Sequence, residues 1–441
     1  MISIRNFDVR GLARAVMSLA VLTAMIACGD ASHILDQEAP SRVEASTLDN
    51  PAYAQLLVNG AIGDFECAFA QYIIAGGLVG DELIDAQLGQ AGWDYDRRTI
   101  FTGSIPYSTG TCNSTQSPGL YTPLSVARFQ GDQALKRLQG WTDAQVTNRQ
   151  SLMAQAATYA GYSLELLGEA MCSAAIDLGP EMTRAQLFAA AQDRFTTAIT
   201  AAQAATPQNT TMLNAARLGR ARSLINQGNL TQARADAVLV PDGFVLNASY
   251  SSAVTRRENL VFTQMYRGFF SSVDASFRSV TFGGVADPRV TVVDAGVKGH
   301  DTQTEIFRQT KYPAINTPIP IARSAEAQLI VAEADNATGT PAGNASAVTA
   351  INVLHTKAGI PAYAGGTQAE VQAQIIEERR RELFLESQRL GDIIRYNLQV
   401  TPAKGQPFKG TFGTYGNDTG IQVCLPLPDI ERNNNPNLSH P

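Results

Sequence analysis

EERRRELFLESQRLGDIIRY, residues 377–396, has the apolar spacing of a helix but carries charges where a simple amphipathic helix would not. Upstream of it, Thr367 and Glu370 have the spacing of a capping box, which marks the start of a helix. From there apolar residues recur at intervals near three, four and seven, at Val371, Ile375, Ile376, Leu383, Leu390 and Ile394. The pattern predicts one long helix from Thr367 to Tyr396.

The charged residues of this segment predict a structural role. Glu377 and Arg381 are four residues apart, a spacing at which opposite charges on a helix stabilise it by about 0.2–0.5 kcal/mol. Glu386 and Arg389, three apart, could pair in the same way. We expect four charged residues to lock the C-terminal segments onto the rest of the protein: Arg379, Glu382, Glu386 and Arg389.

The charge order from Glu378 to Arg395, E-R-R-x-E-L-x-x-E-x-x-R-x-x-D-x-x-R, resembles the C-terminal signature of the SusD/RagB family of outer-membrane nutrient-binding lipoproteins. Three further segments are similar to motifs of that family: 319–334 (IPIARSAEAQLIVAEA), 350–361 (AINVLHTKAGIP) and 425–438 (LPLPDIERNNNPNL). His355 occupies a position where the family usually has Arg. Upstream the resemblance is weaker and rests on Asp81-Glu82 after a first helix.

The resemblance implies one domain over residues 49–441. It would be mostly α, with a SusD-like helical scaffold of tetratricopeptide-like helix pairs plus loop-rich, minor β insertions. The residues themselves predict paired, Ala-rich helices between 49 and 241, the first of them beginning at Asn50-Pro51 and ending near Ala75. Short β-like runs among Gly, Pro, Asp and Ser clusters predict an irregular insertion over 242–320. Helices and the terminal motif are expected over 321–441.

The N-terminus predicts export. Three arginines precede a thirteen-residue apolar run, 15–27, which is too short to span a bilayer but typical of a signal peptide. Ala27 followed by Cys28 resembles a bacterial lipobox. We therefore expect removal of residues 1–27, lipidation of Cys28, and a flexible tether over 28–48. The alternative is ordinary secretion with Cys28 cleaved off or disulfide-bonded.

The mature chain would be mildly acidic. Residues 1–27 contain three Arg and one Asp, a net charge of +2, so their removal changes the net charge from −6 to −8. A nucleic-acid partner would require clustered Lys and Arg instead. The charge therefore argues against nucleic-acid binding.

Four cysteines remain after Cys28, and their wide spacing excludes a zinc-ribbon pattern. An exported protein can form disulfides, and four cysteines allow three pairings. Our hypothesis pairs Cys67 with Cys172 and Cys112 with Cys424. Free buried thiols are the alternative.

Templates for catalysis are missing from the sequence. It contains no G-x-S-x-G, H-E-x-x-H, Walker A or G-x-G-x-x-G pattern, and its four His are scattered. The carboxylate pairs Glu165/Glu169 and Glu382/Glu386 have helical spacing and are interpreted as ion-paired or solvated helix residues. We expect no catalytic residues, no cofactor and no metal, although a D-x-D at Asp94 could weakly favour a hard cation.

Gly92-Trp93-Asp94-Tyr95-Asp96-Arg97-Arg98 is the best candidate for ligand binding. Trp93 and Tyr95 could offer flat faces to sugar rings, with Asp94 and Arg97 as hydrogen-bonding groups. The family resemblance implies glycan or other polymer binding through aromatic residues in loops. The alternative is that Trp93 packs beneath its own loop.

Three classes of function follow. The first, implied by the resemblance, is an outer-membrane, lipid-anchored protein that captures a nutrient, expected to be a glycan or oligosaccharide. It would deliver this nutrient to a TonB-dependent SusC-like transporter. The second is a helical-repeat scaffold lipoprotein for envelope assembly. The third is a secreted hydrolase, for which no acid/base pair is evident.

Overall fold

The computed structural model describes residues 47–112, 114–410, 412–416 and 423–438. The predicted signal peptide, Cys28 and the tether up to residue 46 lie outside the described residues. The chain divides into two compact units, Met1–Asn50 and Pro51–Pro441. Of the first unit only Thr47–Asn50 are described, with the 3-10 helix η2 at Thr47–Asp49. All that follows concerns the second unit.

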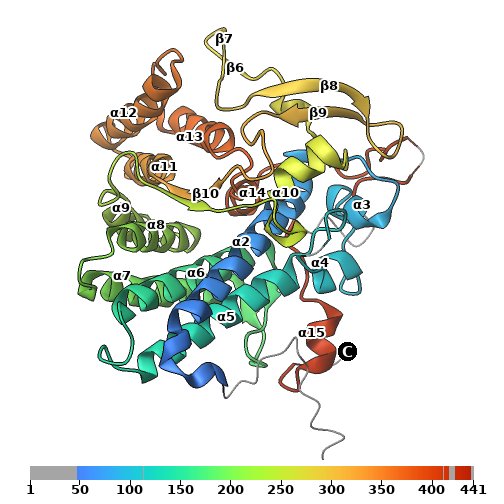
Figure 1. Ribbon diagram of the computed structural model, residues 1–441. Coiled ribbons are helices and arrows are strands. Elements are labelled where there is room, and N and C mark those ends of the chain that lie inside the picture. The colour runs from blue at the N-terminus through green and yellow to red at the C-terminus, as the bar shows by residue number, and fades with distance from the viewer. Residues whose placement is uncertain (1–46, 113, 411, 417–422, 439–441) are drawn as a thin grey trace, which may run out of the picture. The chain divides into compact units, whose positions relative to one another are not determined.

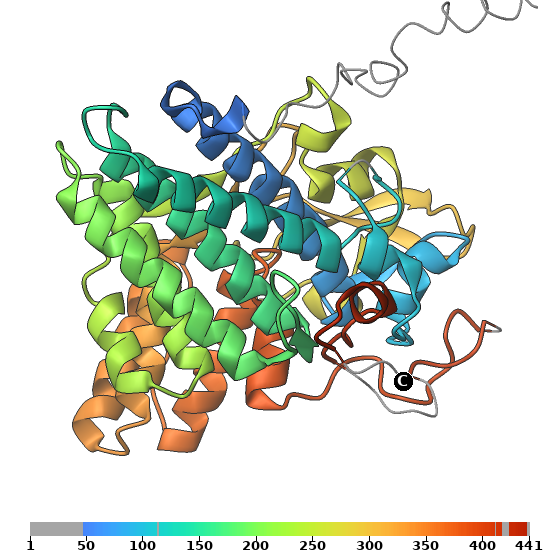
Figure 2. The same ribbon diagram turned by 90° about the horizontal axis from the view of Figure 1, so that it is seen from below.

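A stack of helices forms one half of this unit, and short strands and loops form the other (Figures 1 and 2). Consecutive helices of the stack contact one another, as in tetratricopeptide-like pairs, which confirms the predicted mostly α fold class. The stack comprises α2 (Ala54–Val79), α5 (Tyr121–Gly140), α6 (Arg149–Ala170), α7 (Arg184–Ala204), α8 (Thr210–Asn226), α9 (Leu230–Ala237), α11 (Ser324–Asn336), α12 (Pro341–Ala358) and α13 (Gln368–Glu382).

Small residues let these helices approach closely. The ring of Phe195 on α7 lies against Gly161 of α6 and Gly219 of α8. A Cβ atom would lie 2.7 Å from a carbon of this ring at Gly161 and 2.3 Å at Gly219. A larger residue at either position would therefore push the helices apart. The Ala-rich and Gly-containing composition of this region therefore serves close helix packing.

Helix α2 is the central helix of the core and is longer than predicted. It continues through Gly76 and Gly77 to Val79 instead of ending near Ala75, because its C-terminal half is buried among other helices. By length and composition the helical segment 51–79 could cross a membrane, but 83% of its most apolar stretch is buried inside the fold. Core packing therefore accounts for its apolar character.

The described strands form short antiparallel pairs, most of which lie outside the helix stack. They are β1 (Leu83–Asp85) with β5 (Ser271–Val273), β2 (Ser173–Ala174) with β3 (Met182–Thr183), β4 (Val245–Ala248) with β10 (Ile319–Arg323), β6 (Thr281–Phe282) with β7 (Val285–Ala286), and β8 (Val292–Lys298) with β9 (Glu305–Gln309). The remaining helical elements are short: η3 (Pro51–Tyr53), α3 (Gln90–Asp96), α4 (Ile105–Thr109), η4 (Thr255–Arg257), α10 (Leu260–Phe262), the π-helix η5 (Thr263–Arg267), η6 (Ala275–Phe277), α14 (Arg389–Tyr396) and α15 (Asp429–Asn434).

The predicted long helix is broken. Its capping box at Thr367 and Glu370 is confirmed, but α13 ends at Glu382 and α14 begins at Arg389. Between them Leu385 and Ser387 have φ values of 54° and 74°. The backbone N–H of Leu385 donates instead to the buried carboxylate of Glu82, at 2.8 Å. A partner from the other end of the chain thus replaces a helical hydrogen bond.

Near the break, the carboxylates of Glu382 and Glu386 take part in a buried ionic network. Glu386, 3% exposed, accepts hydrogen bonds from Arg323 Nε at 2.7 Å and from Lys311. Glu382 accepts from Arg323 Nη1 at 2.6 Å and from Arg289 Nη1 at 3.1 Å. These three cations come from β10 and from the 242–320 segment. The network therefore joins the signature segment to that part of the fold.

Two more ion pairs of the signature reach other elements. Arg379 on α13 contacts Asp392 on α14 at 2.8 Å, and Arg389 contacts Asp81, just after α2, at 2.9 Å. The Glu377–Arg381 pair is confirmed at 2.6 Å, whereas Glu386 and Arg389 do not pair with each other. The geometry agrees with a structural role for the signature.

The disulfide hypothesis is wrong in its pairing. Cys67 is bonded to Cys112, with their Cα atoms 5.9 Å apart, and Cys172 to Cys424, at 4.9 Å. The middle of α2, not the end of α6, faces the loop that carries Cys112. The terminal segment instead lies along the end of α6, where Leu425 N–H donates to Ala170 O at 2.8 Å. The Cys172–Cys424 bond follows from that contact.

A second buried charge cluster holds α6, α8 and α11 together. Arg222 on α8 donates to both carboxylate oxygens of Glu169 on α6, at 2.8 Å and 2.7 Å. Glu326 on α11 lies 3.8 Å from the same guanidinium. Glu165, one turn before Glu169, accepts hydrogen bonds from Ser223 and, at 2.7 Å, from the Asn226 amide. The helical spacing of Glu165 and Glu169 therefore serves helix packing.

Two buried glutamates, one in this cluster and one near β1, predict that the stability of the fold decreases as pH rises. Burial raises the pKa of Glu165 to about 8, and burial likewise raises the pKa of Glu82 to about 7. The folded protein keeps these protons at pH values where the unfolded chain, with an ordinary Glu pKa of 4.5, has lost them. Rising pH therefore favours unfolding. We expect the melting temperature to decrease steadily from about pH 5 to about pH 8.5, with each unit of pKa difference worth about 1.4 kcal/mol.

Glu165→Gln, which keeps the shape but cannot ionise, should flatten this decrease, whereas Glu305→Gln at an exposed position should leave it unchanged. Thermal melts across the pH series measure both. A flat or rising profile in the wild-type protein would show that the cluster is ionised throughout.

Candidate functional site

Several segments meet around the end of β1. The backbone N–H of Ala86 donates to Phe270 O at 2.8 Å, and Asp301 N–H donates to Ala86 O at 3.1 Å. Helix α3 packs on the same strand, and Gly92 allows the close contact because a Cβ there would lie 1.8 Å from Asp85 Oδ1. Residues 85–88, α3, the turns at 269–270 and 299–301, and the segments 408–410 and 412–416 thus form one surface, here called the β1-end surface.

Trp93 lies on the outer side of α3 and is half-buried. Its indole N–H donates to Gln87 O at 2.8 Å. The ring packs edge-on against Phe408 at 5.8 Å between centroids and lies 4.9 Å from the ring of Phe412, which is 36% exposed. Trp93 and Phe412 therefore present an aromatic edge at the surface, held by a fixed indole hydrogen bond.

The other predicted platform residues are placed differently from the prediction. Tyr95 is 1% exposed, and its hydroxyl donates to Pro118 O at 2.8 Å, so the expectation that it is exposed is wrong. Asp94 is also buried and accepts from Arg97 at 3.3 Å and from Thr99 at 3.0 Å. The segment forms helix α3 instead of a loop, and residues two apart on a helix face nearly opposite directions.

Arg97 connects α3 to the C-terminal segment. Its Nη1 donates to Phe412 O at 3.0 Å, and its guanidinium lies 5.7 Å from the Phe408 ring. Arg97 O accepts from Gly416 N–H at 2.7 Å. Arg97 therefore fixes Phe412 beside Trp93.

Lys409 clamps the same segment onto β1. Its ammonium lies 3.0 Å from Asp85 and 2.8 Å from Asp301, and 5.6 Å from the Trp93 ring. A cation over an aromatic face is attracted by the ring quadrupole. Burial raises the pKa of Asp85, and it raises that of neighbouring Asp96 to about 7. Lys409 thus offsets part of the cost of burying these carboxylates.

The clustered aspartates do not amount to a metal centre. Within the part of the chain that the structure describes, no group of three or more His, Cys, Asp or Glu side chains could hold a metal ion. The ammonium of Lys409 occupies the position between Asp85 and Asp301. Asp94 and Asp96, considered for a cation from the sequence, instead contact Arg97 and the Asp85 backbone.

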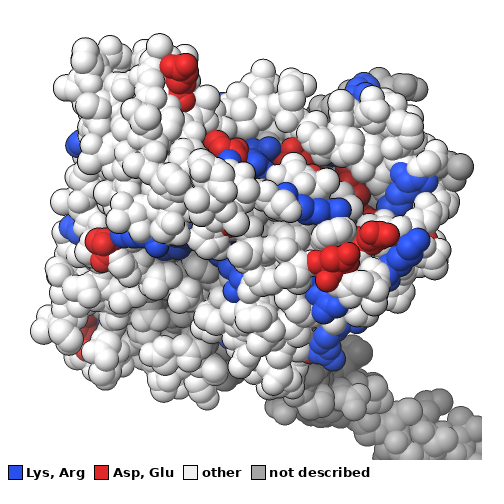
Figure 3. Space-filling view, turned by 90° about the horizontal axis from the view of Figure 1, so that it is seen from above, with Lys and Arg blue, Asp and Glu red and all other residues white. Residues whose placement is uncertain are grey.

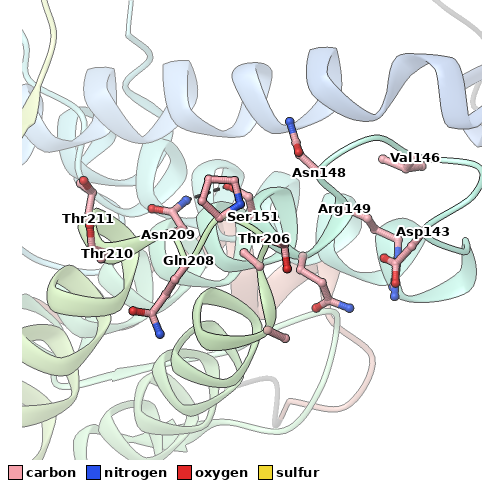
Figure 4. A pocket seen from close by; sticks show the side chains of 14 residues that line it. Asp143, Val146, Asn148, Arg149, Ser151, Thr206, Gln208, Asn209, Thr210 and Thr211 are labelled. Atoms are coloured by element: carbon pink, nitrogen blue, oxygen red, sulfur yellow. Dashed lines mark hydrogen bonds and ion pairs between the residues drawn. The ribbon is translucent and has the colours of Figure 1, made fainter.

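A polar groove of about 570 Å³ lies elsewhere, at the turns of the helix stack (Figure 4). It is formed by the start of α6 and the connection between α7 and α8. Arg149 at its edge pairs with Asp143 at 2.8 Å, and Asn209 donates to Ser151 at 2.8 Å. The residues that line the groove include no aromatic side chain. It therefore lacks the stacking faces of the β1-end surface.

Sequence reasoning missed several residues of the β1-end surface: Phe412, Lys409, His300 and Asp301. Phe412 and Lys409 lie in a glycine-rich loop whose composition gives no sign of where it docks. His300 is exposed, and its ring lies tilted against that of Phe270 with centroids 4.8 Å apart. The basic and aromatic residues Phe408, Lys409 and Phe412 lie close together in the sequence, and this pattern could have indicated a ligand-binding loop.

Comparisons with known proteins agree with this fold. The family model described as "SusD family" matches residues 299–440. A SusD-like carbohydrate binding protein from Bacteroides vulgatus is 16% identical, with a TM-score of 0.64 over 88% of this chain and 97% of that one. Surface glycan-binding protein A from Bacteroides uniformis is 16% identical, with a TM-score of 0.64 over 88% of this chain and 98% of that one. A SusD superfamily protein from Bacteroides fragilis is 14% identical, with a TM-score of 0.65 over 89% of this chain and 99% of that one.

No curated protein matches the chain. The SusD/RagB resemblance noted in the C-terminal motifs is confirmed by the family model over 299–440 and by the shared fold over most of the chain. Residues 299–440 thus match the SusD family model, and most of the chain shares the fold of SusD-like proteins.

Proposed function

We propose that this protein captures a glycan on the outer membrane and passes it to a TonB-dependent SusC-like transporter, without catalysis. The observation that carries the proposal is the aromatic edge of Trp93 and Phe412 on the β1-end surface. Sugar rings bind aromatic faces, and nearby polar groups bind their hydroxyls. Two proteins of the same fold carry the names carbohydrate binding protein and glycan-binding protein, which supports this class of ligand.

Attachment to the membrane is the second part of the proposal. Cys28 follows a run of residues typical of a lipoprotein signal, and it would carry the lipid. Several acyl chains, at about 0.8 kcal/mol per buried CH₂, would hold the protein firmly on the membrane. A protein so anchored could remain beside a transporter while it binds ligand.

Binding experiments on Trp93 and Phe412 test the ligand site. Phe412→Ala should weaken binding to a responsive glycan by about 2 kcal/mol, roughly 30-fold, because it removes an exposed ring from the aromatic edge. Its melting temperature should stay close to that of the wild-type protein, since Phe412 is 36% exposed. Trp93→Ala should weaken binding at least as much, with some loss of stability because Trp93 packs on Phe408. Titration calorimetry against a glycan panel, with a thermal melt of each variant, measures both effects.

Phe129→Ala provides the matched control, because Phe129 is 43% exposed on α5, away from α3. It should bind glycan as the wild-type protein does. Unchanged affinity in both Phe412→Ala and Trp93→Ala would rule out this surface as the ligand site. A wild-type protein that binds no glycan would redirect attention to the helix stack and its polar groove.

A further inference from the structure

Arg308 on β9 lies against two aromatic rings, those of Tyr266 and Phe269, beside the β1-end surface. Its guanidinium carbon lies 5.1 Å from the centre of the Tyr266 ring and 5.8 Å from that of Phe269. Tyr266 is itself fixed, because its hydroxyl donates to Gln309 O at 2.7 Å and its ring stacks on Phe262 at 4.8 Å. The rings hold the guanidinium by its faces and leave its hydrogen-bonding edge to other partners.

The hydrogen-bonding edge of Arg308 is poorly satisfied. Nε is buried and has no hydrogen-bond partner, and Nη2 has only a 3.4 Å contact with Ala295 O. Among the described residues no carboxylate forms an ion pair with Arg308. By contrast, Arg267 is paired with Glu258 at 3.2 Å, and Lys409 with Asp85 and Asp301. Arg308 therefore carries a positive charge that the protein leaves uncompensated.

The rings around Arg308 lie close to the β1-end surface that carries Trp93. Phe269 is followed by Phe270, whose carbonyl accepts from Ala86 N–H at 2.8 Å at the end of β1. A Cβ at Gly299 would lie 2.5 Å from Ala86 Cβ and 3.0 Å from Phe269 O, so the turns at 269–270 and 299–301 pack tightly together. Arg308 thus lies at the edge of the β1-end surface, where it could contact one end of a bound oligosaccharide.

Arg308 is half-buried, and a guanidinium that loses part of its hydration without gaining a charged partner is unfavourable. A ligand carboxylate would supply the missing partner, and it matches the planar fork of Arg with two parallel hydrogen bonds. On the face shown in Figure 3, Lys and Arg lie beside Asp and Glu, without one extended field of either sign. Selectivity for an anionic ligand would therefore come from local contacts such as those of Arg308, and not from an extended positive field.

We propose that Arg308, framed by Tyr266 and Phe269, binds the carboxylate of a uronic acid, so that the captured glycan is acidic. This inference rests on the proposed glycan binding and specifies its ligand class. A neutral sugar would leave Arg308 unsatisfied and would gain only the ring contacts.

Titration calorimetry with matched ligands tests the inference. The ligands are uronate hexasaccharides, from galacturonate, glucuronate and alginate series, and the same hexasaccharides after reduction of their carboxyl groups to hydroxymethyl groups. The wild-type protein should bind at least one acidic ligand about 10- to 100-fold more tightly than its reduced counterpart, as expected for a charge-assisted hydrogen-bonded pair. Arg308→Gln should abolish that preference, and Arg308→Lys should retain part of it, because the charge remains but the fork is lost. Added salt should weaken acidic binding in the wild-type protein more than in Arg308→Gln.

Arg267→Gln, an exposed neighbour that already has an acid partner, should keep the wild-type preference. Arg308→Gln should also melt close to the wild-type temperature, because no ion pair is lost. Equal affinity for acidic and reduced ligands would overturn the inference while leaving glycan binding intact. An acidic preference that survives in Arg308→Gln would likewise overturn it. Binding of neither ligand form, nor of any glycan, would overturn the proposed function as well.

Discussion

An Arg222→Met variant should unfold about 5 °C below the wild-type protein. Arg222 is 2% exposed and neutralises Glu169, which it contacts through two hydrogen bonds, with Glu326 3.8 Å away. Removing one partner of a buried ion pair costs about 3–5 kcal/mol, because the other charge stays buried without compensation. At about 2.1 cal/mol/K of unfolding entropy per residue, that loss corresponds to roughly 5 °C for a unit of this size. Differential scanning calorimetry measures it.

Arg220→Met on the same helix is the matched control. Its side chain is 26% exposed and pairs with Asp236 at 2.7 Å, so its loss should cost only about 1 kcal/mol. The double variant Glu169→Gln with Arg222→Met should recover part of the stability, since it also removes the uncompensated carboxylate. A melting temperature of Arg222→Met within a degree of the wild-type value would contradict the stabilising role of this guanidinium.

Local chemistry explains why parts of the fold could be predicted. The capping box at Thr367 and Glu370 involves residues three apart, and the Glu377–Arg381 pair lies on one helix turn. The end of that helix depends instead on Glu82, which is 303 residues before Leu385 in the sequence. No periodicity within the helix contains that information, so a continuous helix was the natural expectation.

The disulfide pairing fails for a similar reason. The spacing of the four cysteines does not determine their pairing, which depends on which loop faces the middle of α2. Gln71, one turn after Cys67, fixes that loop by donating to Ser114 O at 3.2 Å and accepting from Gly119 N–H at 2.9 Å. Those contacts bring Cys112, not Cys172, to Cys67.

Of the two aromatic residues predicted to contact ligand, one lies at the surface. Trp93 is at the surface beside Phe412, as an aromatic ligand contact requires, and Arg97 orders its surroundings. The error concerned Tyr95, because in a loop both aromatic residues could face outward. On helix α3 they are about 200° apart around the axis, so one faces solvent and the other the core. The unpaired charge of Arg308 could not be inferred at all, since it depends on which acids are absent from its surroundings in space.

Glu386→Ala is expected to destabilise the protein by about 3–5 kcal/mol while leaving glycan affinity unchanged at a permissive temperature. The carboxylate of Glu386 receives hydrogen bonds from Lys311 and Arg323, and the substitution would leave both cations with fewer partners inside the fold. It lies in the connection between α13 and α14, whereas the described contacts of Trp93 are with Gln87, Phe408, Lys409 and Phe412. Thermal melting and glycan titration of the same preparation separate stability from binding.

Glu377→Ala supplies the comparison for Glu386→Ala, because Glu377 also pairs with two arginines but its side chain is 29% exposed. Its loss should cost no more than about 1 kcal/mol, as for other partly exposed ion pairs. Glu386→Gln should fall between the two, since the amide can still accept a hydrogen bond from Arg323 but carries no charge to offset Lys311. If Glu386→Ala instead melts like the wild-type protein and loses glycan binding, the signature segment belongs to the ligand site, because only direct contact with ligand would combine those two results.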